Sequence, residues 1–130
     1  MDCVSPPLST GRTLQYLSES SVQSRIVERG FASDGSLANL PHSDLTTHVY
    51  EGGFKVWECS LDLCEAIESD PSLVRGKRIL ELGCGAALPS ISALLNGASS
   101  AVLQDFNKAV LDCFTTENLQ INNCDLESVK

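Results

Sequence analysis

Basic residues are scarce in this chain of 130 residues. Lysine and arginine together number 9, against 17 aspartates and glutamates, so the formal net charge is −8. A protein that binds nucleic acid non-specifically needs a basic surface, because its cations must displace the counterions of the phosphate backbone. The composition therefore argues against direct nucleic-acid binding and is compatible with a basic protein partner.

Long apolar runs and metal-binding motifs are also missing. No stretch approaches the ~18 apolar residues that predict a membrane-spanning helix. The sequence does not open with the basic and then apolar pattern of a signal peptide. The 6 cysteines show no CxxC spacing and no histidine clusters with them, so we expect no metal site. We therefore expect free thiols in a reducing compartment and no membrane partner.

The composition changes near residue 45. Residues 1–45 are rich in serine and are broken up by prolines and glycines. The stretch 14–27 contains apolar residues, but they form no clean helical stripe. We therefore predict that residues 1–45 are mostly disordered or loosely attached, and that residues 46–130 form the folded part.

Beyond residue 46 the pattern alternates between helices and strands. The pair Gly52-Gly53, followed by an aromatic and β-branched run, predicts a hairpin or an extended arm. A helix is expected over 61–69, with Ser60 as its cap and Asp70-Pro71 as its stop. The elements expected after it are a strand over 79–82, a glycine loop over 83–87, a helix over 88–95, a strand over 101–104 and a helix capped by Asn107. The tail over 118–130 is expected to be a loop or the start of a third strand. The strand–helix–strand order implies an α/β fold with a parallel sheet and a right-handed crossover.

The glycine loop, with the strand before it, reads ILELGCGAALPSI and indicates a nucleotide-type ligand. In a βαβ unit, ligands bind beyond the carboxyl ends of the strands. Gly83 and Gly85 permit positive φ and a close approach of the backbone to a ligand. Asp105 lies 20 residues beyond Gly85, at the end of the second strand. This is the spacing expected of an acid that accepts the hydroxyls of a ribose.

The residues around this loop favour S-adenosylmethionine over a dinucleotide. A dinucleotide loop of the GxGxxG type needs a third glycine at position 88, where Leu88 stands. Glu81 lies two residues before the first glycine, as in loops that bind S-adenosylmethionine, and it can receive the cationic amino group directly or through water. A plain strand-to-helix turn in an unrelated domain stays open as the alternative.

Three segments together resemble the histidine protein methyltransferase family. They are YEGGFKVWECSLDL, GKRILELGCGAALPSI and LQDFN, in this order over roughly residues 48–122. The resemblance implies a Rossmann-like class I methyltransferase fold, of which residues 46–130 are the N-terminal half, truncated after the first βαβα unit. It also implies methyl transfer from S-adenosylmethionine to a histidine of a large-subunit ribosomal protein, in the cytoplasm and nucleus.

The resemblance implies a cofactor site with three parts. The residues concerned are Val56, Trp57, Glu58, Cys59 and Ser60 over the cofactor, Glu81, Gly83, Cys84 and Gly85 under its methionine part, and Gln104, Asp105 and Phe106 at its ribose and adenine. The face of Trp57 attracts a cation such as a sulfonium, and an ionised Asp105 is an acceptor that suits a diol. Structural alternatives are Trp57 as a core anchor, Glu58 as a solvated residue at the helix entry and Phe106 as a core residue. No residue is a candidate for the general base, so the catalytic residue is unknown.

The sequence departs from the family pattern at two positions and leaves two further functions open. The family commonly has glycine where Ala87 and Ser90 stand, and Ala87 would crowd the loop if that position needs positive φ. Methyl transfer depends on a complete pocket that positions both reactants, so we expect this chain to be inactive and its full-length parent to be active. The open alternatives are a protein lysine methyltransferase of the same fold and a non-catalytic fragment that docks onto a ribosomal or chaperone partner.

Overall fold

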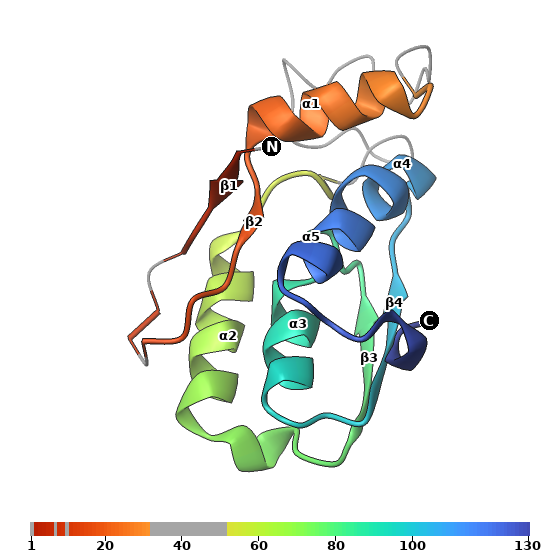
Figure 1. Cartoon of the computed structure of the whole chain (residues 1–130). Helices are drawn as coiled ribbons and strands as arrows, with labels where there is room; N and C mark the ends of the chain where they lie inside the picture. The colour runs from red at the N-terminus through yellow and green to blue at the C-terminus, as the bar shows by residue number, and fades with distance from the viewer. Residues whose placement is uncertain (1, 7, 10, 32–51) are drawn as a thin grey trace.

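The computed structural model describes residues 2–6, 8–9, 11–31 and 52–130. Its elements are β1 (Cys3–Val4), β2 (Tyr16–Leu17), α1 (Glu19–Glu28), α2 (Glu58–Ser69), β3 (Arg78–Leu82), α3 (Leu88–Leu95), β4 (Ser100–Gln104), α4 (Lys108–Val110) and α5 (Thr116–Ile121), with a π-helical turn at Leu111–Thr115 and 3-10 turns at Pro71–Leu73 and Leu126–Ser128. Figure 1 shows these elements along the chain.

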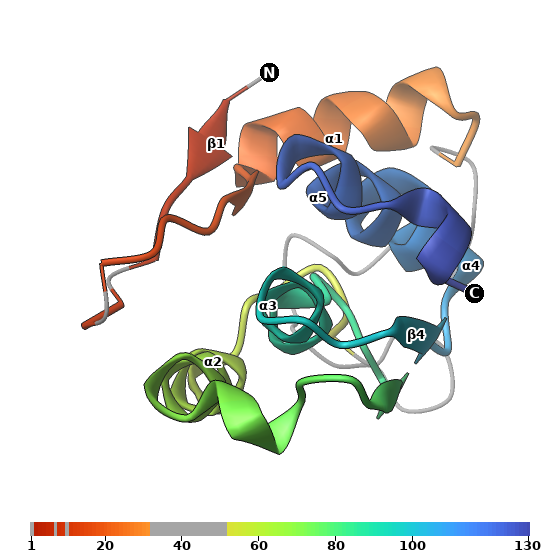
Figure 2. The same cartoon turned by 60° about the horizontal axis from the view of Figure 1, so that its bottom comes forward.

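The sheet consists of the parallel pair β3 and β4, with α3 as the connection between them. Leu80 pairs with Val102 in the centre of this register. Helix α3 packs against the sheet and α2 packs against α3, so two helical layers cover one face (Figure 2). The α/β class, the parallel pairing and the helix between the strands confirm the prediction made from the alternating pattern.

The predicted tail over 118–130 is helical at its start, where residues 118–121 belong to α5, and it continues with a 3-10 turn and the start of a further strand. Val129 forms a parallel bridge with Ala101, and the Leu103 N–H donates to the Lys130 carbonyl at 2.7 Å. Because Ala101 also pairs with Ile79 of β3, Val129 lies along the opposite edge of β4. The strands therefore succeed one another outward from β3, as they do in half of a doubly wound sheet.

No described element covers the second face of the sheet. Leu80, Leu82 and Val102 point to this face and are 64%, 70% and 44% exposed. Strands of an all-parallel sheet are apolar on both sides because helices normally cover both faces. Within residues 52–130 and the N-terminal stretches that the structure describes, only the face toward α3 has that cover.

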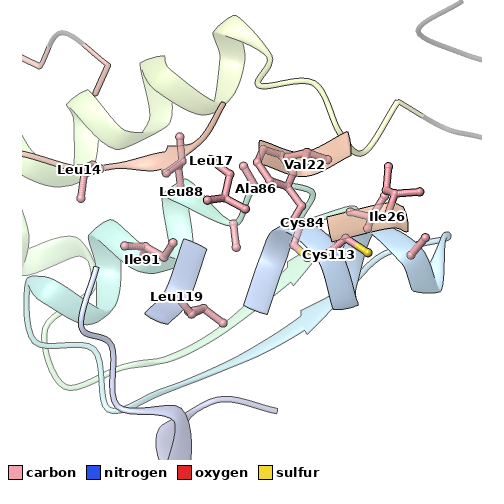
Figure 3. Close-up of a cluster of buried hydrophobic side chains, with 14 of the residues drawn as sticks. Leu14, Leu17, Val22, Ile26, Cys84, Ala86, Leu88, Ile91, Cys113 and Leu119 are labelled. Carbon is pink, nitrogen blue, oxygen red and sulfur yellow. The ribbon is translucent and has the colours of Figure 1, made fainter. Parts of the chain in front are cut away.

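The prediction of a disordered or loosely attached N-terminal segment is wrong for residues 11–31. Strand β2 pairs with β1, and α1 lies across the helices that follow β4 (Figure 1). Leu14, Leu17, Val22 and Ile26 are at most 4% exposed and belong to the main hydrophobic core (Figure 3). The apolar residues over 14–27 show no single helical stripe because the helix begins only at Glu19. Within the helix, Val22 and Ile26 form a buried i, i+4 pair. Residues 32–45 lie outside the described residues.

Two further boundary predictions need correction. Helix α2 begins at Glu58 with Trp57 as its N-cap, so Ser60 lies inside the helix and does not cap it. Residues 52–57 form turns and bends without a strand, so the described part of the arm contains no hairpin, and residues 48–51 lie outside the described residues. The stop at Asp70-Pro71 is confirmed, because Asp70 is the C-cap of α2 and Pro71 opens a 3-10 turn.

Side-chain amides of α5 and of its C-cap hold the N-terminal segment to the core. Asn118 is fully buried, accepts from the Leu17 N–H at 2.9 Å and donates to the Ala86 carbonyl at 3.2 Å. Asn122 accepts from the Gln15 N–H at 2.9 Å and donates to the Gln15 carbonyl at 2.7 Å. These amides make hydrogen bonds to the backbone of Leu17 in β2 and of Gln15 just before it, as a neighbouring strand would.

Substitution of Asn118 by leucine should destabilise the fold. The change keeps a buried side chain of similar size but leaves the Leu17 N–H and the Ala86 carbonyl without this partner, and each buried unpaired group costs about 1–3 kcal/mol. We expect the free energy of unfolding to fall by about 2–4 kcal/mol in urea titration. Gln120→Leu, at an exposed position of the same helix, is the control. Equal stability of the two variants would contradict the role assigned to Asn118.

Candidate functional site

A cavity lies where β3 and β4 end. Its volume is about 150 Å³. Eight of the predicted site residues line it, namely Trp57, Ser60, Gly83, Cys84, Gly85, Gln104, Asp105 and Phe106. Sites for drug-sized ligands measure about 300–1,000 Å³, so this cavity is smaller than a typical site of that kind.

The glycine loop is fastened to the end of β4 by hydrogen bonds. The Gly83 N–H donates to Gln104 Oε1 at 3.0 Å, and the Cys84 N–H donates to the Gln104 carbonyl at 2.8 Å. The Gly85 N–H donates to Asp105 Oδ2 at 2.9 Å. Gln104 and Asp105 therefore fix the shape of the loop as well as facing the cavity.

Asp105 retains acceptor capacity for a ligand. Its Oδ2 accepts from the Gly85 N–H, and its Oδ1 accepts from the Asn107 N–H at 3.3 Å. An ionised carboxylate offers about four acceptor positions. The group can therefore hold the loop and accept the hydroxyls of a bound ribose at the same time. Asn107 starts α4 as predicted, although its side chain makes no capping bond.

The glycine pair at 52–53 was predicted as a turn only, but it also lines the cavity. A Cβ on Gly85 would lie 2.9 Å from the Gly53 carbonyl oxygen, and a Cβ on Gly53 would lie 2.6 Å from a methyl carbon of Val110. The two loops touch because Gly85 has no side chain, and the 52–53 turn packs against Val110 of α4 because Gly53 has none. Two adjacent glycines directly before the segment assigned to the cofactor were the available signal for this contact.

Trp57 forms a wall of the cavity and is not a core anchor. It is 36% exposed, and its indole N–H donates to the Gly52 carbonyl at 3.0 Å. The Lys55 ammonium lies 4.5 Å from the ring centroid, so the ring already attracts a cation. Phe106 is 54% exposed beside Asp105, which leaves its ring free to lie against a base and excludes the core reading.

The other four predicted site residues do not line the cavity. Val56 packs against the hydrophobic core. Glu58 and Cys59 are exposed in the first turn of α2. The helix dipole stabilises a carboxylate there, so Glu58 agrees with the alternative of a solvated residue at the helix entry. Glu81 turns toward α3, where its Oε1 accepts from the Ser90 N–H at 3.2 Å and from the Ser90 hydroxyl at 2.6 Å.

Burial shifts the pKa of two groups beside the loop. It raises the pKa of the Cys84 thiol to about 12, which favours the neutral thiol. Burial also raises the pKa of Glu81, and the two hydrogen bonds from Ser90 oppose that shift.

The π-helical turn brings the Thr115 hydroxyl to the Gly85 carbonyl, to which it donates at 2.6 Å. This bond also fixes the glycine loop.

Ala87, which stands where the family commonly has glycine, has the positive φ that strains an alanine. Its φ is +62°, and it is fully buried at the start of α3. A left-handed conformation costs an alanine about 1–2 kcal/mol relative to the right-handed one. The loop therefore keeps the geometry of a glycine loop at an energetic cost.

Metal-ligand clusters and membrane-spanning helices are both absent from the described parts of the chain. In residues 2–31 and 52–130, with the gaps given above, no group of His, Cys, Asp or Glu side chains is arranged to hold a metal ion. No helix among these residues is long and apolar enough to cross a bilayer. All 6 cysteines are free thiols.

Sequence comparison identifies the relatives of this chain. No family model matches it. The histidine protein methyltransferase 1 homolog of Dictyostelium discoideum is 44% identical over 91 residues, which cover 70% of this chain and 29% of that protein. The Bos taurus protein of the same name is 36% identical over 112 residues, covering 85% of this chain and 30% of that protein. The chain is a relative of the histidine protein methyltransferases.

The matches cover most of this chain but less than a third of each relative. Histidine protein methyltransferase 1 of Saccharomyces cerevisiae is 41% identical over 88 residues, which cover 60% of this chain and 23% of that protein. The chain spans less than a third of the length of these relatives. A match over 85% of the chain also reaches into residues 1–45, since residues 46–130 make up only about two thirds of it.

One solved structure shows a looser likeness. A candidate RNA methyltransferase from Pyrococcus horikoshii superposes with a TM-score of 0.44 and 26% sequence identity, over 55% of this chain and 33% of that one. Because the superposition is partial, the α/β assignment rests on the pairing of β3 with β4 and on the helix that joins them.

Proposed function

We propose that this chain supplies the cofactor-binding part of an S-adenosylmethionine-dependent protein histidine methyltransferase. The observation that carries the proposal is the Asp105 carboxylate, which holds the Gly85 N–H and faces a cavity bordered by Trp57 and Phe106. This arrangement suits a nucleoside with a cationic substituent, and the relatives named above are histidine protein methyltransferases. When bound, the cofactor supplies an activated methyl group on sulfur.

Each part of the cavity has a distinct task in this proposal. Asp105 accepts hydrogen bonds from the ribose hydroxyls, and Phe106 lies against the adenine. The loop at Gly83 and Gly85 lets the chain approach the methionine part closely. Trp57 faces the sulfonium and excludes water from it. The histidine side chain that receives the methyl group comes from the substrate protein.

Binding of the cofactor can be measured through Trp57, which is the only tryptophan of the chain. We expect S-adenosylhomocysteine to change its fluorescence and Asp105→Ala to raise the Kd about 10- to 100-fold, because a hydrogen bond to a charged group contributes about 1.5–3 kcal/mol. Asp112→Ala is the matched control, since that carboxylate pairs with Lys108 outside the cavity. An unchanged Kd in Asp105→Ala would contradict the assignment of the ribose acceptor, and absence of any binding would favour the non-catalytic docking fragment.

We propose further that the substrate is a large-subunit ribosomal protein and that the protein acts in the cytoplasm and nucleus. A net charge of −8 suits a basic substrate protein. The 130-residue chain alone is proposed to be inactive, because a cavity of about 150 Å³ does not enclose a cofactor and its acceptor. Full-rate methylation of ribosomal proteins by the purified chain would contradict this point.

A chimera tests the choice of histidine over lysine. This chain would replace the matching segment of the Saccharomyces cerevisiae relative, and the chimera would be expressed in yeast that lacks its own copy. We expect methylhistidine in hydrolysed ribosomal protein from cells that carry the chimera, and Asp105→Ala in the chimera to remove it. Methyllysine in its place would favour the lysine methyltransferase alternative.

A further inference from the structure

Glu81 has a function that its position before the glycine loop did not predict. Ala87 is the N-cap of α3 and has no side-chain acceptor, and Pro89 has no N–H to donate. The first turn of α3 therefore needs an acceptor from elsewhere. Glu81 of β3 provides it, because its Oε1 accepts from the backbone N–H and from the hydroxyl of Ser90.

Ser90 holds this carboxylate with little freedom. The serine is 1% exposed, and its hydroxyl lies 2.6 Å from Glu81 Oε1, which is the short distance of a charge-assisted bond. Both bonds go to the same oxygen. The side chain is thus fixed through Oε1, and Oε2 has no donor among the described residues.

We propose that Ser90 is a positioning residue: it anchors Glu81 Oε1 at the start of α3 and thereby presents Oε2 to the cationic amino group of the bound cofactor. The inference rests on the proposed function, since it concerns the methionine part of the same ligand. The hydrogen bonds from Ser90 also counteract the effect of burial on the pKa of Glu81, so they help keep the carboxylate ionised. Ser90 therefore acts on the ligand only through Glu81.

Two ligands separate this role from a general effect on the fold. S-adenosylhomocysteine carries the amino-acid part, whereas methylthioadenosine has the same nucleoside and thioether without it. The ratio of their Kd values measures what the amino-acid part contributes. Ser92→Ala is the matched control, because Ser92 is also fully buried on α3 and its hydroxyl also donates to a glutamate, Glu68 Oε1, at 2.8 Å.

The test is a titration of Trp57 fluorescence with both ligands in four variants of this 130-residue chain. Ser90→Ala should weaken S-adenosylhomocysteine about 3- to 10-fold and leave methylthioadenosine within about 2-fold, as one lost hydrogen bond predicts. Glu81→Gln should do the same, and Ser90→Ala should add nothing to it in the double variant. Ser92→Ala should leave the ratio of the two Kd values unchanged.

Three results would overturn the inference. Equal weakening of both ligands by Ser90→Ala would make Ser90 a structural residue of the loop. An unchanged ratio in Glu81→Gln would separate Glu81 from the amino group. A further drop in the double variant would mean that Ser90 acts by another route. If neither ligand binds the unaltered chain, the proposed function itself fails, which is a distinct outcome.

Discussion

Gly85→Ala is expected to lower the free energy of unfolding by about 2–5 kcal/mol and to weaken cofactor binding at least tenfold. Two costs add in this variant. The residue has φ +50°, where an alanine costs about 1–2 kcal/mol. The new Cβ would also lie 2.9 Å from the Gly53 carbonyl oxygen, and such overpacking costs about 1–3 kcal/mol. Relief of the contact must separate the two loops that line the cavity.

Gly76→Ala is the control for Gly85→Ala. Gly76 has φ +73°, but a Cβ there would meet nothing within 4 Å. This variant should lose only the conformational part, about 1–2 kcal/mol. Guanidinium titration of both variants and a ligand titration of Gly85→Ala measure these effects. If both substitutions cost the same and binding persists, the contact between the loops is not required.

The double variant Leu14→Ala/Leu17→Ala should be largely unfolded at room temperature. Both side chains are at most 2% exposed within the main core, and a buried leucine reduced to alanine costs about 2–5 kcal/mol. The sum approaches the whole stability of a small domain, about 5–15 kcal/mol. Circular dichroism at increasing temperature measures the loss.

The control for this experiment is Val4→Ala/Val27→Ala, in the same N-terminal segment. These valines are 39% and 66% exposed, so truncation should cost less than about 1 kcal/mol. If the segment were loosely attached, the two double variants would unfold at similar temperatures. A clear separation between them would establish residues 11–31 as part of the fold.

The βαβ unit was predictable from the sequence because its signals are local. Pro89 stands in the first turn of α3, where its missing N–H costs nothing, and Gly97 follows the helix with φ +99°. The observed bounds of α3 are those predicted, and the strands differ by one residue at their start. Each of these boundaries depends on residues within one turn of it.

The position of the N-terminal segment was not predictable in this way. Gln15 hydrogen-bonds Asn122, which lies 107 residues away, and Leu17 hydrogen-bonds Asn118, which lies 101 residues away. A serine-rich composition describes the solvent-facing side of this segment and hides the buried leucines. The orientation of Glu81 was likewise beyond the sequence pattern, because it depends on the hydroxyl of Ser90.

The side of the sheet that no described element covers has a consequence for how this protein behaves at high concentration. Leu80, Leu82 and Val102 form a water-exposed apolar strip beside the outer edge of β3, which pairs with no described strand. Such an edge is a template for pairing with other chains, and such a strip promotes association. The solubility of the purified chain should therefore fall as its concentration rises, and a charged residue in place of Leu80 should reverse that loss.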